Sequence, residues 1–155
     1  MNFKIIYLSS EKNSNIEILV NNYIKKIKHL ADVELFKIHN KNKSKKNKFN
    51  IDYESNLIIN QLSKNDINIL IDEKGDMYET IEFSKFIQKN FLYSSKKIVF
   101  IIGGAYGFNK ELNKTVEKKI SLSKFTFTHD MARLLLIEQI YRALTLIKNI
   151  PYHNH

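Results

Sequence analysis

The order of apolar and polar positions along the chain predicts β-strands that alternate with α-helices. Apolar or alternating runs typical of strands occupy residues 3–8, 33–38, 67–72 and 97–102. Apolar residues recur at helical spacing in residues 14–29, 51–64 and 79–91. The polar residues 73–76, which include a glycine, predict a turn. This alternation predicts an α/β fold, a mostly parallel sheet flanked by helices, in a single domain covering residues 1–155.

The last third of the chain predicts a long helix over residues 131–148, with Asp130 as its N-cap. Its apolar residues recur at helical spacing at Leu134, Ile137, Ile140, Tyr141, Leu144 and Ile147. Glu138 lies four residues before Arg142, which is the spacing of an ion pair worth about 0.3–0.5 kcal/mol on a helix surface. On that interpretation Arg133 and Arg142 are ordinary residues of the helix surface.

The composition draws attention to the same third of the chain. The net charge is +9, but only two of the 25 basic residues are arginine, Arg133 and Arg142. Three of the four glycines lie at 103, 104 and 107, and the one proline is Pro151. In a chain otherwise rich in lysine, asparagine and isoleucine, this concentration of unusual residues predicts that function or demanding backbone geometry resides there. The positive charge favours polyanionic partners such as nucleic acid or anionic membrane surfaces.

The absence of cysteine excludes disulfides, thiol nucleophiles and thiolate metal sites. The apolar run at the start is too short for a signal peptide, and no stretch approaches the roughly 18 apolar residues of a membrane span. We therefore expect a cytoplasmic protein without a membrane partner.

A glycine turn at residues 103–107 directly follows the apolar strand 97–102. It matches neither the G-x-G-x-x-G fingerprint nor a P-loop, so a phosphate-cradling nucleotide site is not indicated. Glycine there allows either a tight strand-to-helix turn or the close approach of a ligand to the backbone. Ligands of parallel α/β folds bind beyond the carboxyl ends of strands, here near Ile71, Gly103 and the residues after Ser121. The segment 121–129 is also compatible with a short edge strand.

Residues 41–48 form a lysine-rich polar segment. One interpretation is a solvated surface loop, and the other is a flap that contacts RNA phosphates. The C-terminal residues 150–155 likewise permit a disordered tail, although an aromatic residue, a histidine and the proline lie together there.

Several motifs in register closely resemble the ribosomal RNA large subunit methyltransferase H family. They are Ile101-Ile102-Gly103-Gly104-Ala105-Tyr106-Gly107, Ser121-Leu122-Ser123, Thr128-His129, Glu138-Gln139-Ile140-Tyr141-Arg142-Ala143 and the terminal Pro151-Tyr152-His153. The chain length also matches, whereas the first hundred residues match only loosely. Ala105-Tyr106 replaces a Pro-Glu of some members, and Asp130 replaces a proline.

This resemblance implies a SPOUT-type fold with a C-terminal trefoil knot, and it implies a homodimer. The reaction it implies is N3-methylation of a pseudouridine in a stem-loop of bacterial 23S ribosomal RNA. The RNA would be part of the large subunit or of the assembled ribosome. The resemblance also implies that S-adenosylmethionine is held without a metal by Ile71, Gly103, Gly104 and the segment Leu122, Ser123, Lys124, Phe125, Thr126 and Phe127. Arg142 is then expected to hold RNA phosphate, Tyr152 to stack on a base, and His153 to act as proton acceptor or hydrogen-bond partner. The alternatives are a SPOUT methyltransferase acting on transfer RNA or a ribose hydroxyl, and a non-catalytic RNA-binding factor of ribosome assembly.

Overall fold

Five parallel strands form a single sheet in the order β2-β1-β4-β3-β5 in the described part of the computed structural model. The structure describes residues 1–8, 14–39, 48–94, 96–104 and 107–153. The strands are β1 (Asn2–Leu8), β2 (Asp32–Ile38), β3 (Ile67–Met77), β4 (Ile98–Ile102) and β5 (Lys118–Ser121). The helices are α1 (Ser14–Lys28), α2 (Lys48–Ile59), α3 (Thr80–Tyr93), α4 (Lys110–Thr115) and α5 (His129–Ile147). The predicted α/β fold with a parallel sheet is confirmed.

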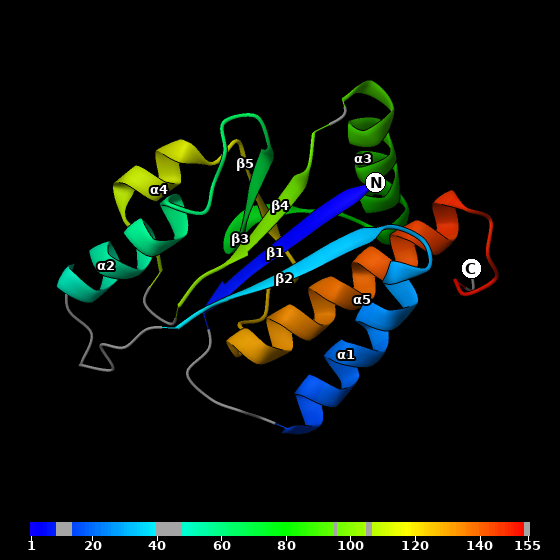
Figure 1. The fold of residues 1–155 in the computed structure, drawn as a ribbon, viewed down its shortest axis with the longest axis horizontal. Coiled ribbons are helices and arrows are strands. Elements are labelled where there is room, and N and C mark those ends of the chain that lie inside the picture. The colour runs from blue at the N-terminus through cyan, green and yellow to red at the C-terminus, as the bar shows by residue number, and fades with distance from the viewer. Residues whose placement is uncertain (9–13, 40–47, 95, 105–106, 154–155) are drawn as a thin grey trace.

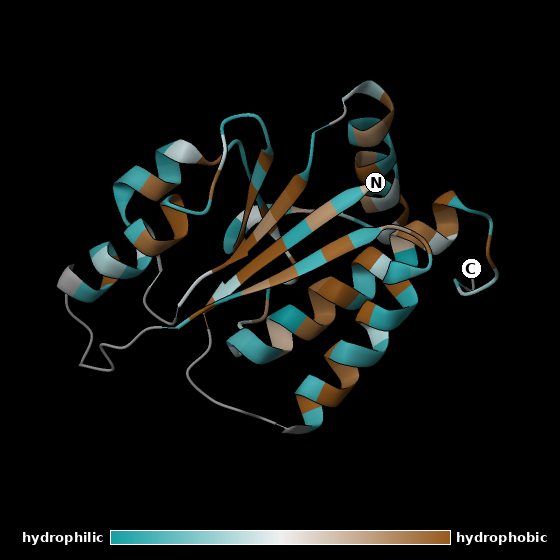
Figure 2. Ribbon diagram, in the orientation of Figure 1, coloured by the Kyte–Doolittle hydropathy of each residue, from teal (hydrophilic) through white to brown (hydrophobic). Residues whose placement is uncertain are grey.

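Helices cover both faces of the sheet, so the molecule has three layers (Figure 1). Helices α1, α3 and α5 pack on one face against alternate strand residues such as Ile5 and Phe100. Helices α2 and α4 pack on the other face against the intervening residues Ile6 and Ile101. The central strands therefore carry hydrophobic side chains on both sides, and Figure 2 colours much of their length as hydrophobic. All five residues of β4 are buried, which explains the continuous apolar run in the sequence.

Residues 73–76 do not form the predicted turn but continue β3 to Met77. The strand continues because β5 pairs with its outer part, with a register shift between Ile71 and Asp76. A Cβ at Gly75 would lie only 2.6 Å from backbone atoms of Ile120, so this glycine permits close contact of two strands. The predicted helix 51–64 was also too long, since α2 ends at Ile59.

The cap predicted for the long helix was wrong by two residues. Helix α5 begins at His129, and the Thr128 hydroxyl accepts a hydrogen bond from the Met131 backbone N–H at 3.4 Å. Asp130 lies inside the first turn, where its carboxylate is 3.4 Å from the Arg133 guanidinium. The segment 122–128 between β5 and α5 is a loop and not a strand.

Arg133 is not on the surface, because its side chain is only 1% exposed. Its guanidinium donates to Glu17 Oε1 on α1 at 2.6 Å and lies 4.4 Å from the centre of the Tyr7 ring. Burial is the main cause that raises the pKa of Tyr7, and the neighbouring Arg133 opposes it. Arg133 therefore joins α5, α1 and the end of β1 at one buried point.

Glu17→Ala is expected to lower the free energy of unfolding by about 2–3 kcal/mol, because it leaves a buried cation with only Asp130 as a partner. Arg133→Met should lower the free energy of unfolding by a smaller amount. The group that it leaves unpaired is the Glu17 carboxylate, which can hydrate because that side chain is 34% exposed. Urea denaturation at a fixed protein concentration measures both. The control, Glu117→Ala at an exposed position, should stay within about 0.5 kcal/mol of the wild type. If Arg133→Met proved the more damaging of the two, the attribution to an unpaired cation would be wrong.

Candidate cofactor and RNA-binding site

A cavity of about 1070 Å³ lies at the carboxyl ends of β3, β4 and β5. Its walls come from the outer part of β3, the connection from β4 to α4 and the loop from β5 to α5. The predicted site residues among its lining are Ile71, Gly103, Gly104, Leu122, Ser123, Phe125, Thr126 and Phe127. Lys124 is exposed and is not among the lining residues. The three predicted segments thus meet at one cavity.

The glycine turn forms a wall of the cavity with no space for side chains at its first two residues. A Cβ at Gly103 would lie 2.2 Å from the Phe108 ring, and one at Gly104 would lie 2.5 Å from Glu54 Oε2. Gly107 has a φ of +81°, a conformation that favours glycine, and its N–H donates to the Gly104 carbonyl at 3.2 Å. The turn is therefore tight, as one of the two interpretations predicted, and its backbone borders the cavity. Ala105 and Tyr106 lie outside the described residues.

The loop 122–128 is held by hydrogen bonds from its own side chains. The Ser121 hydroxyl donates to the Ser123 carbonyl at 2.8 Å, and the Ser123 hydroxyl accepts from the Phe125 N–H at 3.0 Å. The Thr126 hydroxyl donates to Glu73 Oε2 at 3.3 Å, which ties the loop to β3. The Phe125 side chain, which is 80% exposed, stands at the edge of the cavity.

Sequence reasoning missed several residues of the cavity. Phe108 follows the glycine turn and occupies the space beside Gly103, and an aromatic residue so close to three glycines was the available signal. Asp72 and Lys119 line the cavity 3.6 Å apart, and His129 and Ala132 contribute the first turn of α5. His129 belongs to the Thr128-His129 motif and Asp72 lies at the strand end beside Ile71, but no sequence pattern indicated Lys119 or Ala132. Their proximity to the site arises from the pairing of β3 with β5 and from the approach of α5.

The C-terminal residues form a polar cluster with the second half of α5. Glu138 Oε1 accepts from Arg142 Nη2 at 2.6 Å, from Arg142 Nε at 3.0 Å and from the Tyr152 hydroxyl at 3.1 Å. The Arg142 guanidinium lies 4.7 Å from the centre of the Tyr152 ring, and its Nη1 is 3.3 Å from His153 Nδ1. The Glu138–Arg142 pair is therefore confirmed, and residues 152 and 153 pack against the helix.

The predicted cofactor residues and the predicted RNA-binding residues lie at opposite ends of α5. His129 and Ala132 at its start line the cavity, whereas Arg142 lies ten residues beyond Ala132, a rise of about 15 Å. Figure 1 shows the C-terminus beside the far end of α5, away from the carboxyl ends of the strands. One chain alone does not bring the two sets of residues together.

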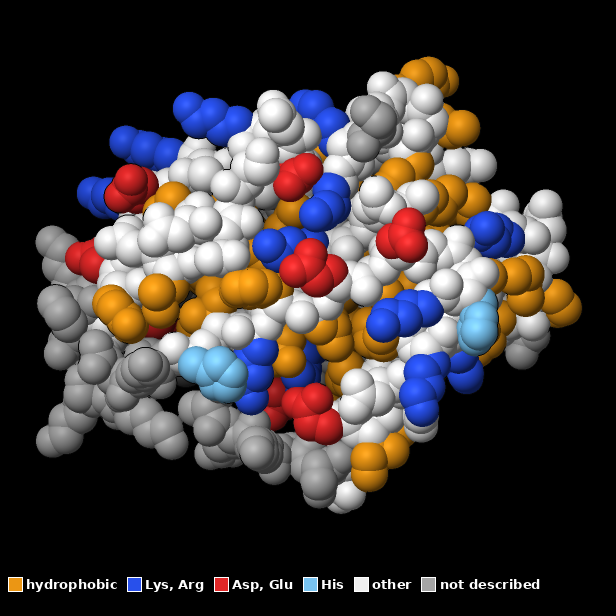
Figure 3. Space-filling model, viewed as in Figure 1, with side chains coloured by type: hydrophobic (Ala, Val, Ile, Leu, Met, Phe, Trp, Pro, Cys, Tyr) orange, Lys and Arg blue, Asp and Glu red, His pale blue; other side chains and the backbone are white. Residues whose placement is uncertain are grey.

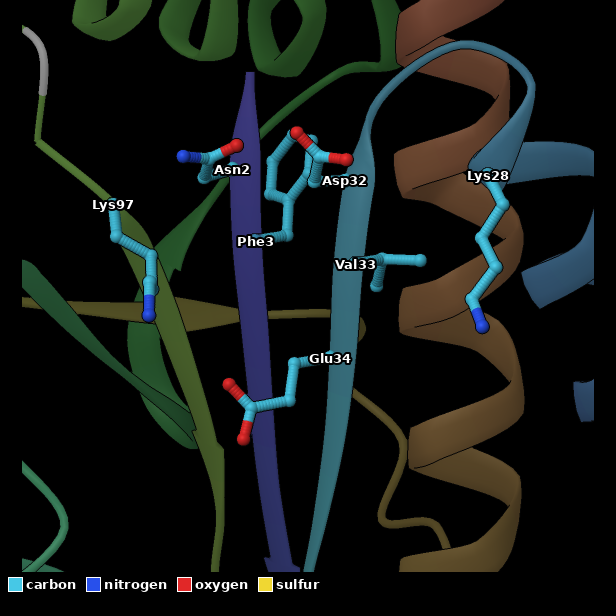
Figure 4. Close-up of a pocket in the computed structure, with 7 residues that line it drawn as sticks. All are labelled: Asn2, Phe3, Lys28, Asp32, Val33, Glu34 and Lys97. Carbon is cyan, nitrogen blue, oxygen red and sulfur yellow. The ribbon is translucent and has the colours of Figure 1, made fainter.

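A second hollow of about 500 Å³ lies at the amino ends of β1 and β2, the opposite end of the sheet from the cavity. Its lining mixes the acidic Asp32 and Glu34 with Lys28 and Lys97 (Figure 4). It contains none of the predicted site residues. Within the described ranges, no cluster of three or more histidine or acidic side chains is arranged to hold a metal ion. No helix in the same ranges is long and apolar enough to span a membrane.

Comparison with known proteins agrees with this geometry. A family model described as "Predicted SPOUT methyltransferase" matches residues 1–153. The proteins named ribosomal RNA large subunit methyltransferase H from Christiangramia forsetii and Flavobacterium psychrophilum are each 36% identical to this chain, over 160 and 162 residues, and each match covers 99% of both chains. The chain belongs to the ribosomal RNA large subunit methyltransferase H family. The family member from Phocaeicola vulgatus is 34% identical over 156 residues, again covering 99% of both chains.

Among solved structures, the fold is similar to the SpoU methyltransferase AviRb from Streptomyces viridochromogenes, which was crystallised in complex with the cofactor AdoMet. The TM-score is 0.48 at 11% sequence identity. The match covers 98% of this chain and 59% of that one.

Proposed function

We propose that this protein is an S-adenosylmethionine-dependent methyltransferase of 23S ribosomal RNA in the bacterial cytoplasm, and that it methylates N3 of a pseudouridine in a stem-loop. The observation that carries the proposal is the cavity beside Gly103 and Gly104, where the family's glycine motif meets the loop 122–128. The chain's membership of the methyltransferase H family supplies the reaction class. Positioning of two reactants can contribute about 7–11 kcal/mol in favourable cases, so neither a metal nor a covalent nucleophile is needed.

The residues around the cavity fit S-adenosylmethionine. A volume of about 1070 Å³ lies just above the usual range of roughly 300–1,000 Å³ for small-molecule sites, so it has room for a cofactor and part of a substrate base together. Gly103 and Gly104 expose backbone groups that can bind the polar edges of the cofactor, and Ile71, Leu122 and Phe108 offer apolar surface. When bound, the cofactor supplies an activated methyl group on a sulfonium.

Positive charge near the cavity supports an RNA substrate. Lys110 and Lys114 on α4 are exposed, and Figure 3 shows several basic side chains gathered over this helix. The connection from β4 to α4 that lines the cavity leads directly into α4. This surface and the net charge of +9 suit contact with phosphates on both sides of a bound base.

A homodimer with shared sites is part of the proposal, because Arg142, Tyr152 and His153 lie far from the cavity of their own chain. Helices α1 and α5 pack side by side and carry exposed apolar residues, namely Ile18, Leu19 and Met131. A two-fold contact through this surface would cover them. An antiparallel arrangement of two α5 helices would also place the C-terminal cluster of one chain beside the cavity of its partner.

The trefoil knot of the SPOUT fold also remains a proposal for this chain. It is supported by the path after β5, because the loop 122–128 passes the carboxyl ends of β3 and β4 beside the glycine turn before entering α5. Helix α5 then lies on the face of the sheet opposite to α4.

Mapping the product tests the function. Ribosomes from a strain lacking this gene would be incubated with the protein and labelled S-adenosylmethionine, and the RNA digested for mass spectrometry. A methyl group on N3 of a pseudouridine in 23S RNA is expected. Label on a ribose or on transfer RNA would contradict the proposal and identify a different substrate. Absence of label together with absence of cofactor binding in calorimetry would favour the non-catalytic assembly factor.

The predicted basic segment 41–48 lies outside the described residues, apart from the backbone of Lys48 at the start of α2. Neutralising Lys45, Lys46 and Lys48 is expected to weaken RNA binding. It should also reduce the slope of log affinity against log salt concentration, by about 1 for each lysine–phosphate contact that is lost. Filter binding between low and moderate salt measures this slope. Neutralising Lys85, Lys89 and Lys96, which are exposed on and after α3, removes equal charge as a control. Equal slopes for the two variants would indicate a merely solvated loop.

A further inference from the structure

Phe125 is an exposed aromatic residue at the edge of the cavity. Its side chain is 80% exposed. Among the large hydrophobic side chains that are exposed in the described part of the chain, Phe125 is the one that also lines the cavity. A single exposed hydrophobic residue needs no explanation on an ordinary surface. At the edge of a binding cavity, however, an exposed ring offers its face to a ligand that covers the cavity.

The loop that carries Phe125 fixes its position. The Phe125 N–H donates to the Ser123 hydroxyl at 3.0 Å, and the Ser121 hydroxyl donates to the Ser123 carbonyl at 2.8 Å. The next residue, Thr126, donates to Glu73 Oε2 on β3 at 3.3 Å. The loop is therefore held on both sides of Phe125, so little conformational freedom of the backbone would be lost when a ligand packs on the ring.

The charged side chains near Phe125 favour a polyanion as that ligand. The carboxylate of Asp72 is offset by Lys119, which lies 3.6 Å from it. Lys74 lines the cavity and Lys124 directly precedes Phe125, and both lysine side chains are exposed. Proteins bind unpaired nucleic acid with this combination, because bases stack on the aromatic ring and lysines contact the phosphates.

The other apolar residues of the cavity suit a ligand that lies inside it. Ile71, Leu122 and Phe127 are half-buried, and Phe108 packs against the glycine turn. These side chains give the proposed cofactor an apolar surface without Phe125. The largely exposed ring of Phe125 is left for a group that approaches from outside the cavity.

We propose that Phe125 binds the RNA substrate by stacking on an unpaired base that flanks the target, and that it does not hold the cofactor. This inference rests on the proposed function. The target base itself must enter the cavity, since its N3 has to reach the methyl group of a cofactor held beside Gly103 and Gly104. A neighbouring base of the same RNA loop then stays at the edge, where it meets the ring of Phe125, and Lys124 contacts a phosphate of that strand.

Four substitutions of Phe125 separate stacking from other contacts. Tyrosine and tryptophan keep an aromatic face, leucine keeps apolar volume without one, and alanine removes both. The assay is single-turnover methylation of ribosomes that lack the modification, with enzyme in excess. Phe125→Ala and Phe125→Leu are expected to raise the enzyme concentration for half the maximal rate by about tenfold, because one base stacked on an aromatic ring contributes about five- to 100-fold in affinity. Phe125→Tyr and Phe125→Trp should stay within about threefold of the wild type, and all four variants should keep the maximal rate.

Binding of the cofactor is the second readout. Isothermal titration calorimetry should give an affinity for S-adenosylmethionine within about twofold of the wild type for all four variants. The chain contains no tryptophan, so the indole of Phe125→Trp is the one source of tryptophan fluorescence in that variant. S-adenosylmethionine should leave this fluorescence unchanged, because the ring at position 125 does not contact the cofactor.

Tyr93→Ala is the matched control. The Tyr93 side chain is also aromatic and is 82% exposed, but it lies at the end of α3 that leads to the amino end of β4, away from the cavity. Its removal should change neither the half-saturating enzyme concentration nor the affinity for the cofactor. Sedimentation analysis should give the same oligomeric state for Phe125→Ala as for the wild type.

Several results would overturn the proposal. Wild-type behaviour of Phe125→Ala or Phe125→Leu would exclude stacking, and weakened cofactor affinity or quenching of the tryptophan by S-adenosylmethionine would place the ring at the cofactor. A maximal rate of Phe125→Ala lowered by more than about tenfold would place it at the target base. Altered self-association would place it in a subunit interface, and an equal loss in Tyr93→Ala would show that the effect is not specific to the cavity. Failure of the proposed function is distinguishable, because the wild type itself would then leave ribosomal RNA unmethylated.

Discussion

Gly103→Val is expected to abolish measurable binding of S-adenosylmethionine while leaving the fold largely intact. A Cβ at this position would lie 2.2 Å from the Phe108 ring, so the larger side chain must displace that ring and occupy the cavity wall. We expect a loss of at least about 100-fold in affinity, which corresponds to roughly 2.7 kcal/mol. Isothermal titration calorimetry measures the affinity, and circular dichroism with thermal unfolding verifies the fold.

Two further variants identify the cause. Gly104→Ala should have a smaller effect, because its Cβ would meet the flexible end of the Glu54 side chain at 2.5 Å. Removing the Phe108 ring in a Gly103→Val/Phe108→Ala chain should recover part of the binding if the displaced ring blocks the site. Unchanged affinity in a folded Gly103→Val protein would show that the cofactor binds elsewhere.

Deleting residues 152–155 is expected to spare cofactor binding and to abolish methylation. The deletion removes Tyr152 and His153 from the cluster around Glu138 and leaves the cavity, at the other end of α5, unaltered. Calorimetry and ribosome methylation measure the two effects separately. Loss of cofactor binding would show instead that the C-terminal residues support the cavity of their own chain.

Mixing the deletion with the Gly103→Val chain tests whether sites are shared. In a mixed dimer, one composite site has both an intact cavity and an intact C-terminal cluster, so part of the activity should return. Mass spectrometry of the mixture verifies that subunits exchange. No recovery after verified exchange would place the C-terminal residues at the site of their own chain, and a monomer in sedimentation analysis would remove the shared-site proposal entirely.

The sequence predicted strands β1 to β4 and helices α1, α2, α3 and α5 because their patterns are local, but it predicted neither β5 nor α4. Buried strands such as β4 show as apolar runs, and helices show as apolar residues at helical spacing. The outer part of β3 could not be predicted, since β5 pairs with Asp76 and Met77 only after a register shift that passes over residues 72–75. The burial of Arg133 depends likewise on Glu17 and Tyr7, which are distant in the sequence.

Only those parts of the candidate site that belong to sequence motifs could be predicted. Gly103, Gly104 and most of residues 122–127 line the cavity as the family resemblance implied. Lys124 does not, because the loop turns its side chain to solvent. The contacts of Tyr152 with Glu138 and of His153 with Arg142 could not be predicted, because no sequence pattern encodes how the C-terminal residues fold back onto α5.

The length of α5 has a consequence for how this enzyme can vary. Its 19 residues span about 28 Å, with a cavity wall at one end and the cluster of Glu138, Arg142, Tyr152 and His153 at the other. If two such helices lie antiparallel in a dimer, their length sets one distance. This is the distance between the cofactor in the cavity of one chain, which donates the methyl group, and the residues of the other chain that would hold the RNA base that accepts it. Inserting one helical turn would move the cluster by about 5.4 Å without altering any functional side chain. In such a dimer, an insertion or deletion within α5 would therefore disrupt the site even where every functional side chain is kept.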